Sequence, residues 1–252
     1  MARWSLHHGD CLEWLRTLPS ASVDAVVTDP PYASLGTSAS TVSRSSQSAA
    51  EMQFYAAWCR EQIREWVRVL RPGGAFWLTV DWRGALCWDE ASASVGFNRL
   101  RVGVWDRGGL GMGSVLRSQY ECFATATLPG WKRQRTDEGD VWRSKWTPSN
   151  RTSGHSAEKP VELMVRAITL LAPRGSVILD PFAGSGTTGV GALLEGYSFV
   201  GCEKSPEYFN IACKRLAAAE RGEAIVRSET TEPKTDEAQT DEAQRALDLT
   251  GP

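Results

Sequence analysis

Apolar and polar positions along the chain follow two alternating patterns. Short runs rich in β-branched residues, each closed by a turn residue, predict strands, and because the runs are continuous they are typical of parallel strands buried on both faces. The longer stretches between them have helical spacing. The predicted strands are Val23–Thr28, Ala75–Val80, Ser176–Leu179 and Ser198–Cys202, and the predicted helices are Glu51–Leu70, Pro160–Leu171, Thr187–Glu195 and Pro206–Arg221.

Strands that alternate with helices predict an α/β fold, here a doubly wound, mostly parallel, Rossmann-like sheet. Two further runs, Arg99–Trp105 and Gln119–Thr127, alternate more between apolar and polar residues and predict an antiparallel edge. The segment Leu128–Gly154 has little periodicity and many Arg, Lys, Trp and Gly residues. We interpret it as an insertion or loop outside the core.

The composition is that of a soluble globular protein. The 252 residues are 42% hydrophobic and 23% charged, which excludes a wholly disordered or collagen-like chain. No apolar run reaches the ~18 residues of a transmembrane helix, and the first residues do not resemble a signal peptide, so we expect a cytoplasmic protein. The six cysteines are scattered and only three histidines accompany them. Neither a disulfide framework nor a metal site is expected.

Acidic and basic residues are distributed unevenly. Residues 220–252 contain nine acidic and four basic side chains, a net charge of −5, so the whole-chain value of −2 leaves +3 for residues 1–219. We predict one folded domain over residues 1–219 and a disordered acidic tail over residues 220–252. The stretch 33–50, rich in Ser, Thr and Ala, predicts a mobile loop that is either an active-site lid or an inert linker.

A glycine loop joins a predicted strand to a predicted helix between Val177 and Thr188. Gly184 and Gly186 allow a ligand to approach backbone N–H groups closely, while their spacing fits neither a P-loop nor the dinucleotide fingerprint. Asp180 ends this strand and Glu203 ends the next, where an acidic residue can accept hydrogen bonds from ribose hydroxyls. The loop therefore indicates a nucleotide-like ligand, with a plain strand–helix turn as the alternative.

The tetrapeptide Asp29-Pro30-Pro31-Tyr32 directly follows the first predicted strand. The two prolines fix the backbone and have no N–H to donate, so carbonyl oxygens remain as acceptors. An Asp29 carboxylate, a Pro30 carbonyl and the Tyr32 ring together fit an exocyclic amino group on a planar base, which has two N–H donors and a π face. A Pro-Pro turn with a surface aromatic residue is the alternative interpretation.

These two motifs together resemble the S-adenosylmethionine-dependent DNA amino-methyltransferases. Their order, with the tetrapeptide first, resembles the beta group of that family, in which the sheet is circularly permuted. His155–Pro160 resembles the family's His-x-x-Glu-Lys-Pro element and Gly9-Asp10-Cys11 its Gly-Asp element, so the resemblance extends from about Leu6 to Leu216. It implies a site-specific enzyme of the restriction-modification kind, with S-adenosylmethionine as cofactor and DNA as substrate.

The resemblance also assigns roles to individual residues. Glu203 would hold the ribose hydroxyls of the cofactor, Asp10 its adenine amino group, and Lys159 would border the same pocket. Tyr32 would stack on a target base flipped out of the duplex. The implied catalytic residues are Asp29, Pro30, Pro31 and Tyr32, and the implied cofactor-binding residues are Asp10, Cys11, Lys159, Asp180, Phe182, Ala183, Gly184, Ser185, Gly186, Thr187 and Glu203.

The chemistry follows from the acceptors of the tetrapeptide. The lone pair of a base amino nitrogen is delocalised into the ring, which makes it a poor nucleophile. Hydrogen bonds from its N–H groups to Asp29 and to the Pro30 carbonyl would favour a pyramidal nitrogen and stabilise its developing positive charge. In-line orientation of the reacting atoms would supply further acceleration. No cysteine occupies the place that a carbon-5 cytosine mechanism requires.

A basic, tryptophan-containing stretch predicts the DNA contact. Basic side chains meet phosphates, and aromatic faces stack or wedge between bases. The expected DNA-binding residues are Lys132, Arg133, Arg135, Arg143, Lys145 and Arg151, interleaved with Trp131, Trp142 and Trp146. This stretch, 128–154, is short for a target-recognition region, so a brief target sequence, a homodimer or help from loop 33–50 would be needed. The alternative is a solvated basic loop with buried tryptophans.

Asp at position 29 favours N6 of adenine as the methylated atom, because cytosine-amino enzymes of the family more often have Ser there. N4 of cytosine is the alternative. Methylation of RNA or of a protein glutamine, and a DNA-binding protein without catalysis, are further readings that the residues leave open.

Overall fold

The computed structural model describes residues 3–33, 49–111, 115–144 and 158–223. Most of the predicted loop 33–50, the end of stretch 128–154 and nearly all of the predicted tail lie outside these residues. The described residues form one eight-stranded sheet in the order β1-β8-β7-β2-β3-β5-β4-β6. Its strands are β1 (Trp4–His8), β2 (Val23–Thr28), β3 (Leu70–Val80), β4 (Arg101–Asp106), β5 (Tyr120–Thr127), β6 (Val141–Arg143), β7 (Val177–Asp180) and β8 (Ser198–Glu203).

Five neighbouring strands of the sheet are parallel. Strand β1 pairs with β8, β8 with β7, β7 with β2 and β2 with β3, all in parallel. Strand β5 lies antiparallel between β3 and β4, and β6 adds a short parallel pairing to β4. The expected α/β fold, a mostly parallel sheet with an antiparallel part, is thereby confirmed.

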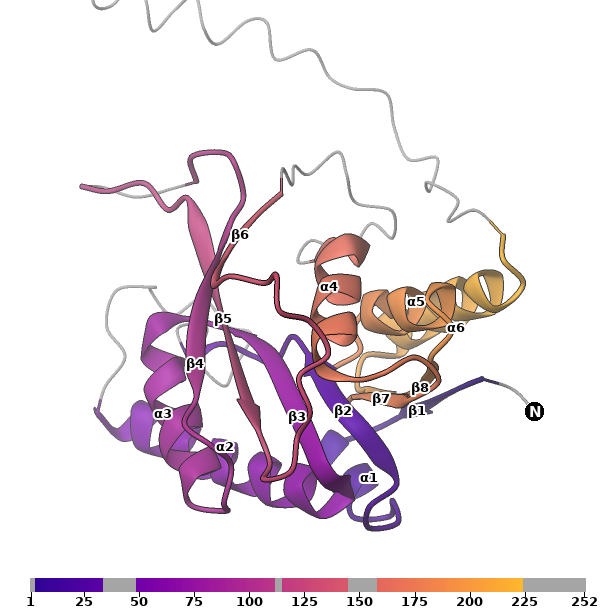
Figure 1. Cartoon of the computed structure of the whole chain (residues 1–252), viewed down its shortest axis with the longest axis horizontal. Helices are drawn as coiled ribbons and strands as arrows, with labels where there is room; N and C mark the ends of the chain where they lie inside the picture. The colour runs from indigo at the N-terminus through magenta and orange to yellow at the C-terminus, as the bar shows by residue number, and fades with distance from the viewer. Residues whose placement is uncertain (1–2, 34–48, 112–114, 145–157, 224–252) are drawn as a thin grey trace, which may run out of the picture.

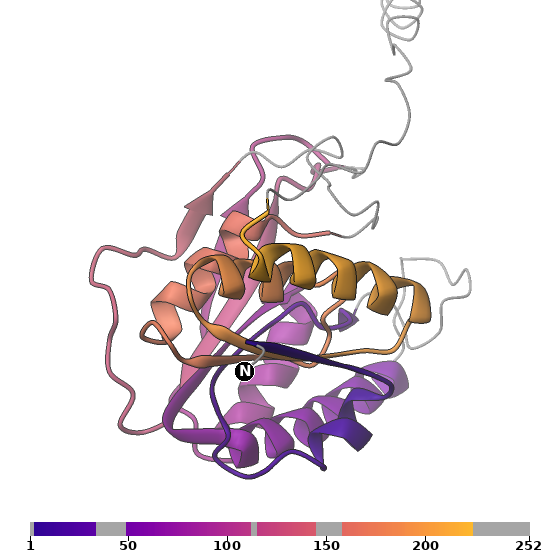
Figure 2. The same ribbon diagram turned by 90° about the vertical axis from the view of Figure 1, so that its right-hand side faces the viewer.

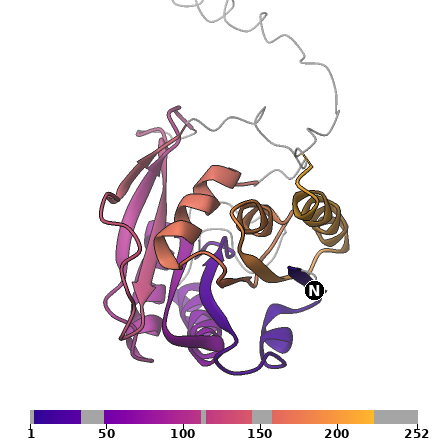
Figure 3. The ribbon, with the colours of Figure 1, turned by 45° about the vertical axis from the view of Figure 1, so that its right-hand side comes forward.

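Helices cover both faces of the sheet. They are α1 (Cys11–Leu15), α2 (Ala49–Val69), α3 (Trp82–Ala93), α4 (Val161–Leu171), α5 (Thr187–Leu194) and α6 (Pro206–Glu220). Figures 1 and 3 show α4, α5 and α6 on one side of the sheet and α2 and α3 on the other. Two hydrophobic clusters fill these layers, one around Trp66 and Trp88 and one around Trp77 and Ile168.

The segment Leu128–Gly154 is not wholly outside the core, which corrects our interpretation of it. Trp142 on β6 is 1% exposed and its ring lies parallel to that of Trp77, with centroids 5.9 Å apart. The ring of Phe123 packs on that of Trp142, with centroids 4.3 Å apart. The three residues of β6 are too few to give a periodic signal, yet burying one indole against the sheet is enough to fix them there.

The two ends of the described chain meet at the amino ends of the parallel strands. Glu220, the last residue of α6, accepts hydrogen bonds from the backbone N–H of Arg3 at 2.8 Å and from the indole of Trp4 at 3.0 Å. Figure 2 shows α6 lying above β1, beside the marked N-terminus.

Parallel strands place all their carboxyl ends at one edge of the sheet, where ligands of open α/β sheets bind. In this chain that edge, referred to below as the carboxyl edge, is formed by the ends of β1, β8, β7, β2 and β3. Within the described ranges, none of the helices combines the length and the apolar character needed to cross a membrane.

Candidate active site

Four carboxylates gather at the carboxyl edge from distant parts of the chain. Asp10 follows β1, Glu203 ends β8, Asp180 ends β7 and Asp29 follows β2. Because these strands are neighbours, the tetrapeptide and the glycine loop adjoin. The hydroxyl of Thr28 donates to Asp180 Oδ1 at 2.6 Å and joins the two motifs directly.

The carboxylate of Asp29 is held from two sides. Thr79, near the end of the neighbouring strand β3, donates its hydroxyl to Oδ1. Lys159 donates from Nζ to Oδ2 at 2.8 Å. We expected Lys159 to border the cofactor pocket, and the structure places its ammonium on Asp29. Burial opposes the charge of Lys159, but the carboxylates of Asp29 and Glu121 hold its pKa well above the usual value.

The ring of Tyr32 is fixed by polar contacts at its hydroxyl and over its face. The Tyr32 hydroxyl donates to Glu121 Oε2 at 3.0 Å, and Lys159 Nζ lies 5.3 Å from the ring centroid, within cation–π range. Burial raises the pKa of Tyr32 well above its usual value, so the phenol stays protonated and remains a donor. Pro31 is fixed as well, because its carbonyl accepts a hydrogen bond from the hydroxyl of Tyr55 at 3.0 Å.

A hollow of about 560 Å³ opens beside Tyr32. Its lining combines aromatic and acidic side chains, and Trp82 is 65% exposed there. Such a mixture suits a flat, partly polar ring. The lining includes Tyr32, Asp81, Trp82, Tyr120 and Glu121.

The glycine loop is held by Glu203. The backbone N–H of Gly184 donates to Glu203 Oε2 at 2.8 Å, and that of Ser205 donates to Oε1 at 2.7 Å. Gly186 has a φ of +83°, and a Cβ there would lie 3.0 Å from Cβ of Ala212 on α6. This position therefore favours glycine on both conformational and steric grounds.

Asp180 is buried and bound mainly to protein groups. Besides Thr28, the backbone N–H of Phe182 donates to its Oδ1 at 3.0 Å. Burial raises the pKa of Asp180 from 3.8 to about 6, against hydrogen bonds from Thr188 and Thr28 that favour the charged form. Phe182 lies farther out, with its ring centroid 5.5 Å from that of Trp58 on α2.

Asp10 and Cys11 lie where β1 turns into α1. Asp10 caps this helix through Oδ1, which accepts from the N–H of Leu12 at 3.0 Å, and its Oδ2 accepts from Lys204 at 3.3 Å. Burial opposes the Asp10 charge, but the hydrogen bonds from Lys204 and the backbone outweigh it and lower the pKa. Burial raises the pKa of the Cys11 thiol, which accepts a hydrogen bond from Gln62 at 3.3 Å.

An ion pair that we did not predict locks the glycine loop to two helices. Arg215 on α6 donates from Nη1 to the carbonyl of Ser185 at 2.7 Å and to its hydroxyl at 2.9 Å. The same guanidinium donates from Nη2 to Glu158 at 2.9 Å, and both side chains are almost fully buried. It also reaches the hydroxyl of Thr187 at 3.3 Å. The residue before Lys159 is therefore tied to the loop through Ser185 and Thr187.

The predicted DNA-binding residues lie in different surroundings. Arg135 is paired with Asp137 at 2.9 Å and with Glu138 at 3.1 Å, whereas Arg143 is 82% exposed and 3.8 Å from Asp106. Lys132 and Arg133 are exposed. Lys145 and Arg151, together with Trp146 and His155, lie outside the described residues. Of the tryptophans, Trp142 is buried and Trp131 is partly buried in the core, its indole donating to the carbonyl of Leu171 at 2.9 Å.

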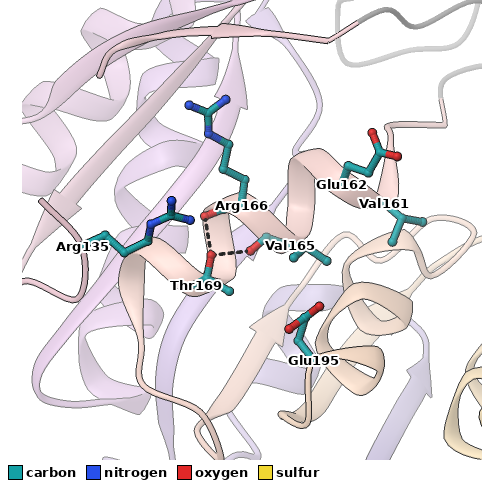
Figure 4. Close-up of a pocket in the computed structure, with 7 residues that line it drawn as sticks. All are labelled: Arg135, Val161, Glu162, Val165, Arg166, Thr169 and Glu195. Atoms are coloured by element: carbon teal, nitrogen blue, oxygen red, sulfur yellow. Dashed lines mark hydrogen bonds between the residues drawn. The ribbon is translucent and has the colours of Figure 1, made fainter. Parts of the chain in front are cut away.

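A second hollow, of about 400 Å³, lies on α4 (Figure 4). Its lining includes none of the four carboxylates at the carboxyl edge. Arg135 and Arg166 flank it in the figure, and both guanidinium groups pair with Glu138. Arg135 also pairs with Asp137, so both basic groups are already matched by carboxylates.

Sequence reasoning missed several residues that shape the site. Thr79 had a usable signal, since it lies near the end of a predicted strand whose neighbours could be guessed. Glu121 lies in the predicted antiparallel run, but nothing local marks it as a partner of Tyr32, 89 residues away. Arg215 lies in an ordinary amphipathic helix, and only the packing of α6 brings it to Ser185.

Comparison with known proteins agrees with this geometry. A family model described as DNA methylase, of the N6/N4 class, matches residues 23–214. The chain therefore belongs to this family of S-adenosylmethionine-dependent DNA amino-methyltransferases.

Three further proteins are similar to the chain in sequence or in fold. The Type II methyltransferase M.ScaI of Streptomyces caespitosus is 28% identical, with 84% of this chain and 81% of M.ScaI covered. The cytosine-N4-specific PvuII DNA methyltransferase shares the fold, with a TM-score of 0.70, 18% identity, and 87% and 93% of the two chains covered. The M1.HpyAVI complex with S-adenosylmethionine also shares it, with a TM-score of 0.62, 22% identity, and 84% and 100% covered.

The described residues fit the cofactor of the family. The tight glycine loop brings backbone close to a ligand, and Glu203 has acceptor capacity beyond its two amide partners because each carboxylate oxygen has two lone pairs. Asp10 lies at the end of the adjacent strand, where its Oδ2 faces Lys204. Both carboxylates are thus available to hydroxyl and amino donors.

Proposed function

We propose that this protein methylates N6 of adenine in double-stranded DNA, as a beta-group enzyme with the permuted motif order. The juxtaposition of Asp29 with Asp180 carries the proposal, because it sets an amino-group acceptor directly beside the cofactor loop. The link through Thr28 and the parallel pairing of β2 with β7 hold these two motifs in register. The target base, flipped from the duplex, would stack on Tyr32 beside the hollow that this ring lines.

S-adenosylmethionine, when bound, would supply the methyl group: its carbon would bond to the base nitrogen as its bond to the sulfonium sulfur breaks, which leaves a neutral thioether, and the methylated nitrogen would then release one proton to solvent. The protein itself contributes hydrogen-bond acceptors for the target amino group. Asp29 and the carbonyl of Pro30 accept hydrogen bonds from the two N–H groups of the target amino group. These bonds stabilise the positive charge that develops on its nitrogen. Thr79 keeps the Asp29 carboxylate fixed in orientation, so little reorganisation of this acceptor is needed at the moment of transfer.

The cofactor-binding roles proposed for the remaining residues follow the same edge of the sheet. Glu203 would receive the ribose hydroxyls and Asp10 the adenine amino group, with Cys11 and Phe182 beside them. The loop from Ala183 to Thr187 would lie along the methionine portion. Lys159 contacts Asp29 and so serves both motifs.

N4 of cytosine is the second candidate atom. The same acceptors would serve it, because both bases present an exocyclic amino group on a ring. Asp at position 29 favours adenine, since cytosine-amino enzymes of the family more often have Ser at that place.

Transfer of labelled methyl from S-adenosylmethionine to duplex DNA, followed by nucleoside analysis, tests the proposal. We expect N6-methyladenine. Detection of N4-methylcytosine would change the assigned target base from adenine to cytosine, and label in RNA or protein would contradict the assigned substrate. Binding of both cofactor and DNA without transfer would identify a DNA-binding protein that lacks catalysis.

Asp29→Ala tests the assigned chemistry. We expect cofactor affinity to stay within about threefold and turnover to fall by at least about 10²-fold, the usual effect of removing a group that stabilises developing charge. Glu90→Ala is the control, since Glu90 pairs with Arg60 on the surface between α2 and α3. Unchanged turnover in Asp29→Ala would remove Asp29 from the mechanism.

A further inference from the structure

The acceptor that the target amino group would use is already in contact with a cation. Lys159 Nζ lies 2.8 Å from Asp29 Oδ2, and its side chain is 10% exposed. An ammonium bound to the same carboxylate repels the positive charge that develops on the base nitrogen during transfer. In this partly buried setting water screens the repulsion poorly. Transfer is therefore hindered while the ammonium keeps this position.

Glu121 is placed to relieve this conflict. Its Oε2 lies 3.4 Å from Lys159 Nζ, so the ammonium already lies between two carboxylates. The same oxygen accepts the Tyr32 hydroxyl at 3.0 Å, and Oε1 pairs with Arg107 at 3.3 Å. Glu121 lies on β5, whose pairing to β3 in the sheet keeps it opposite the tetrapeptide. It thus contacts both the cation, which also pairs with Asp29, and the tyrosine that carries the stacking ring.

We propose, resting on the function proposed above, that Glu121 is a positioning residue that receives the ammonium of Lys159 when the target amino group binds Asp29. A shift of Nζ toward Glu121 needs no new partner, because the ion pair exists already and only its distances change. The hydrogen bond from Tyr32 to Glu121 couples the shift to the ring on which the base stacks. Glu121 acts through Lys159 and does not itself contact the reacting atoms.

A double-mutant cycle between Glu121→Gln and Lys159→Met tests the proposal. The glutamine keeps an acceptor for the Tyr32 hydroxyl and removes the charge that faces Lys159 and Arg107, and only the first of these effects depends on Lys159. We expect Glu121→Gln alone to lower kcat about 10- to 100-fold, with the KM for DNA and the affinity for S-adenosylmethionine within about twofold of wild type. In the Lys159→Met background the same substitution should change kcat less than about twofold, because the cation it serves is gone.

Equal losses in both backgrounds, or no loss in wild type, would overturn the proposal, because Glu121 would then act independently of Lys159 or not at all. Glu90→Gln is the matched control on α3 and should leave kcat unchanged. If Lys159→Met does not bind cofactor, the cycle is run with Lys159→Gln, which removes the charge but retains a donor for Asp29. If the wild-type protein methylates DNA and the losses in the variants are additive, only this inference is contradicted. If the wild-type protein methylates no DNA, the proposed function is contradicted as well.

Discussion

At the scale of the residue, the site combines carboxylates whose pKa values are shifted in opposite directions. Asp10 faces Lys204 and has a lowered pKa, whereas Asp180 is buried among hydroxyls and a backbone amide and has a raised one. A carboxylate that serves a ligand must remain charged and reachable. One that only ties β2 to β7 does not need its charge. Through its hydrogen bonds from Thr28 and from the backbone of Phe182, Asp180 joins β7 to β2 and orders the start of the glycine loop.

This difference predicts how Asp180→Asn changes stability with pH. The folded pKa of Asp180 is about 6, against 3.8 in the unfolded chain, so between these values the folded state holds a proton that the unfolded state has lost. Its contribution to the free energy of unfolding therefore falls as the pH rises from about 4 to 6, and above that it is a constant penalty of about 2–3 kcal/mol.

We expect Asp180→Asn to raise the free energy of unfolding by up to about 2 kcal/mol at pH 7.5, with the gain vanishing near pH 4, in urea titrations at both pH values. Asp137→Asn, an exposed carboxylate paired with Arg135, serves as the control. A gain of the same size at both pH values would show that the buried charge is not its cause.

At the scale of the element, the buried pair of Arg215 and Glu158 links α6, the start of α4 and the glycine loop. Removing one partner of a buried ion pair costs about 3–5 kcal/mol, whereas an exposed pair contributes about 0–1 kcal/mol. Arg215→Met should therefore lower the free energy of unfolding by about 3 kcal/mol and weaken S-adenosylmethionine binding, because Ser185 loses its clamp.

Arg174→Met is the matched control for Arg215→Met, since Arg174 is 77% exposed in its pair with Glu195. Urea denaturation and calorimetric titration of cofactor measure the two effects. Equal small losses in both variants would show that the buried pair contributes no more than a surface one.

Elements with long periodic signals were predictable, and short ones were not. The strand Val23–Thr28 has the predicted bounds, and α6 begins at the predicted Pro206, where Ser205 caps it. Strand β1, whose residues are mostly exposed or half-buried, and α3, which begins after Asp81, had no predicted counterpart. Their signals depend on partners distant in sequence: β1 is fixed by its pairing to β8 and α3 by its packing on α2.

The same distinction applies to the site. Asp29, Tyr32, Asp180 and Glu203 could be placed at strand ends from the sequence, because turn residues mark where each strand stops. Glu121 and Arg215 could not, since only the strand order and helix packing bring them into contact with the site, whereas Thr79 had a signal in its position near the end of a predicted strand. The sequence pattern therefore indicated the hydrogen-bond acceptors of the tetrapeptide, and the tertiary fold supplied the groups that orient them.

At the scale of the whole molecule, the basic stretch 128–144 spans two opposite edges. Its start is bound at the amino end of β3, where the N–H of Leu128 donates to the carbonyl of Gly74 at 2.8 Å. Its end, Arg143, lies beside Asp106 at the other end of the antiparallel group. The six residue-to-residue steps of strand from Gly74 to Val80 separate these edges by about 20 Å.

Duplex DNA presented to the carboxyl edge should therefore meet Arg143 and not Lys132. We expect Arg143→Ala to weaken DNA binding and to reduce the slope of log affinity against log salt by about 1, and Lys132→Ala, its matched control, to change neither. Fluorescence anisotropy at several salt concentrations measures both. A larger effect from Lys132→Ala would place the duplex at the other edge.

The contact of Glu220 with Arg3 and Trp4 has a practical outcome for handling the protein. Because β1 begins, and α6 finishes, at the edge opposite the four carboxylates, a tag joined directly to residue 3 or to residue 223 would start from the rear of the molecule. Tethering to a sensor chip or fusion to a programmable targeting module would leave the front accessible to duplex.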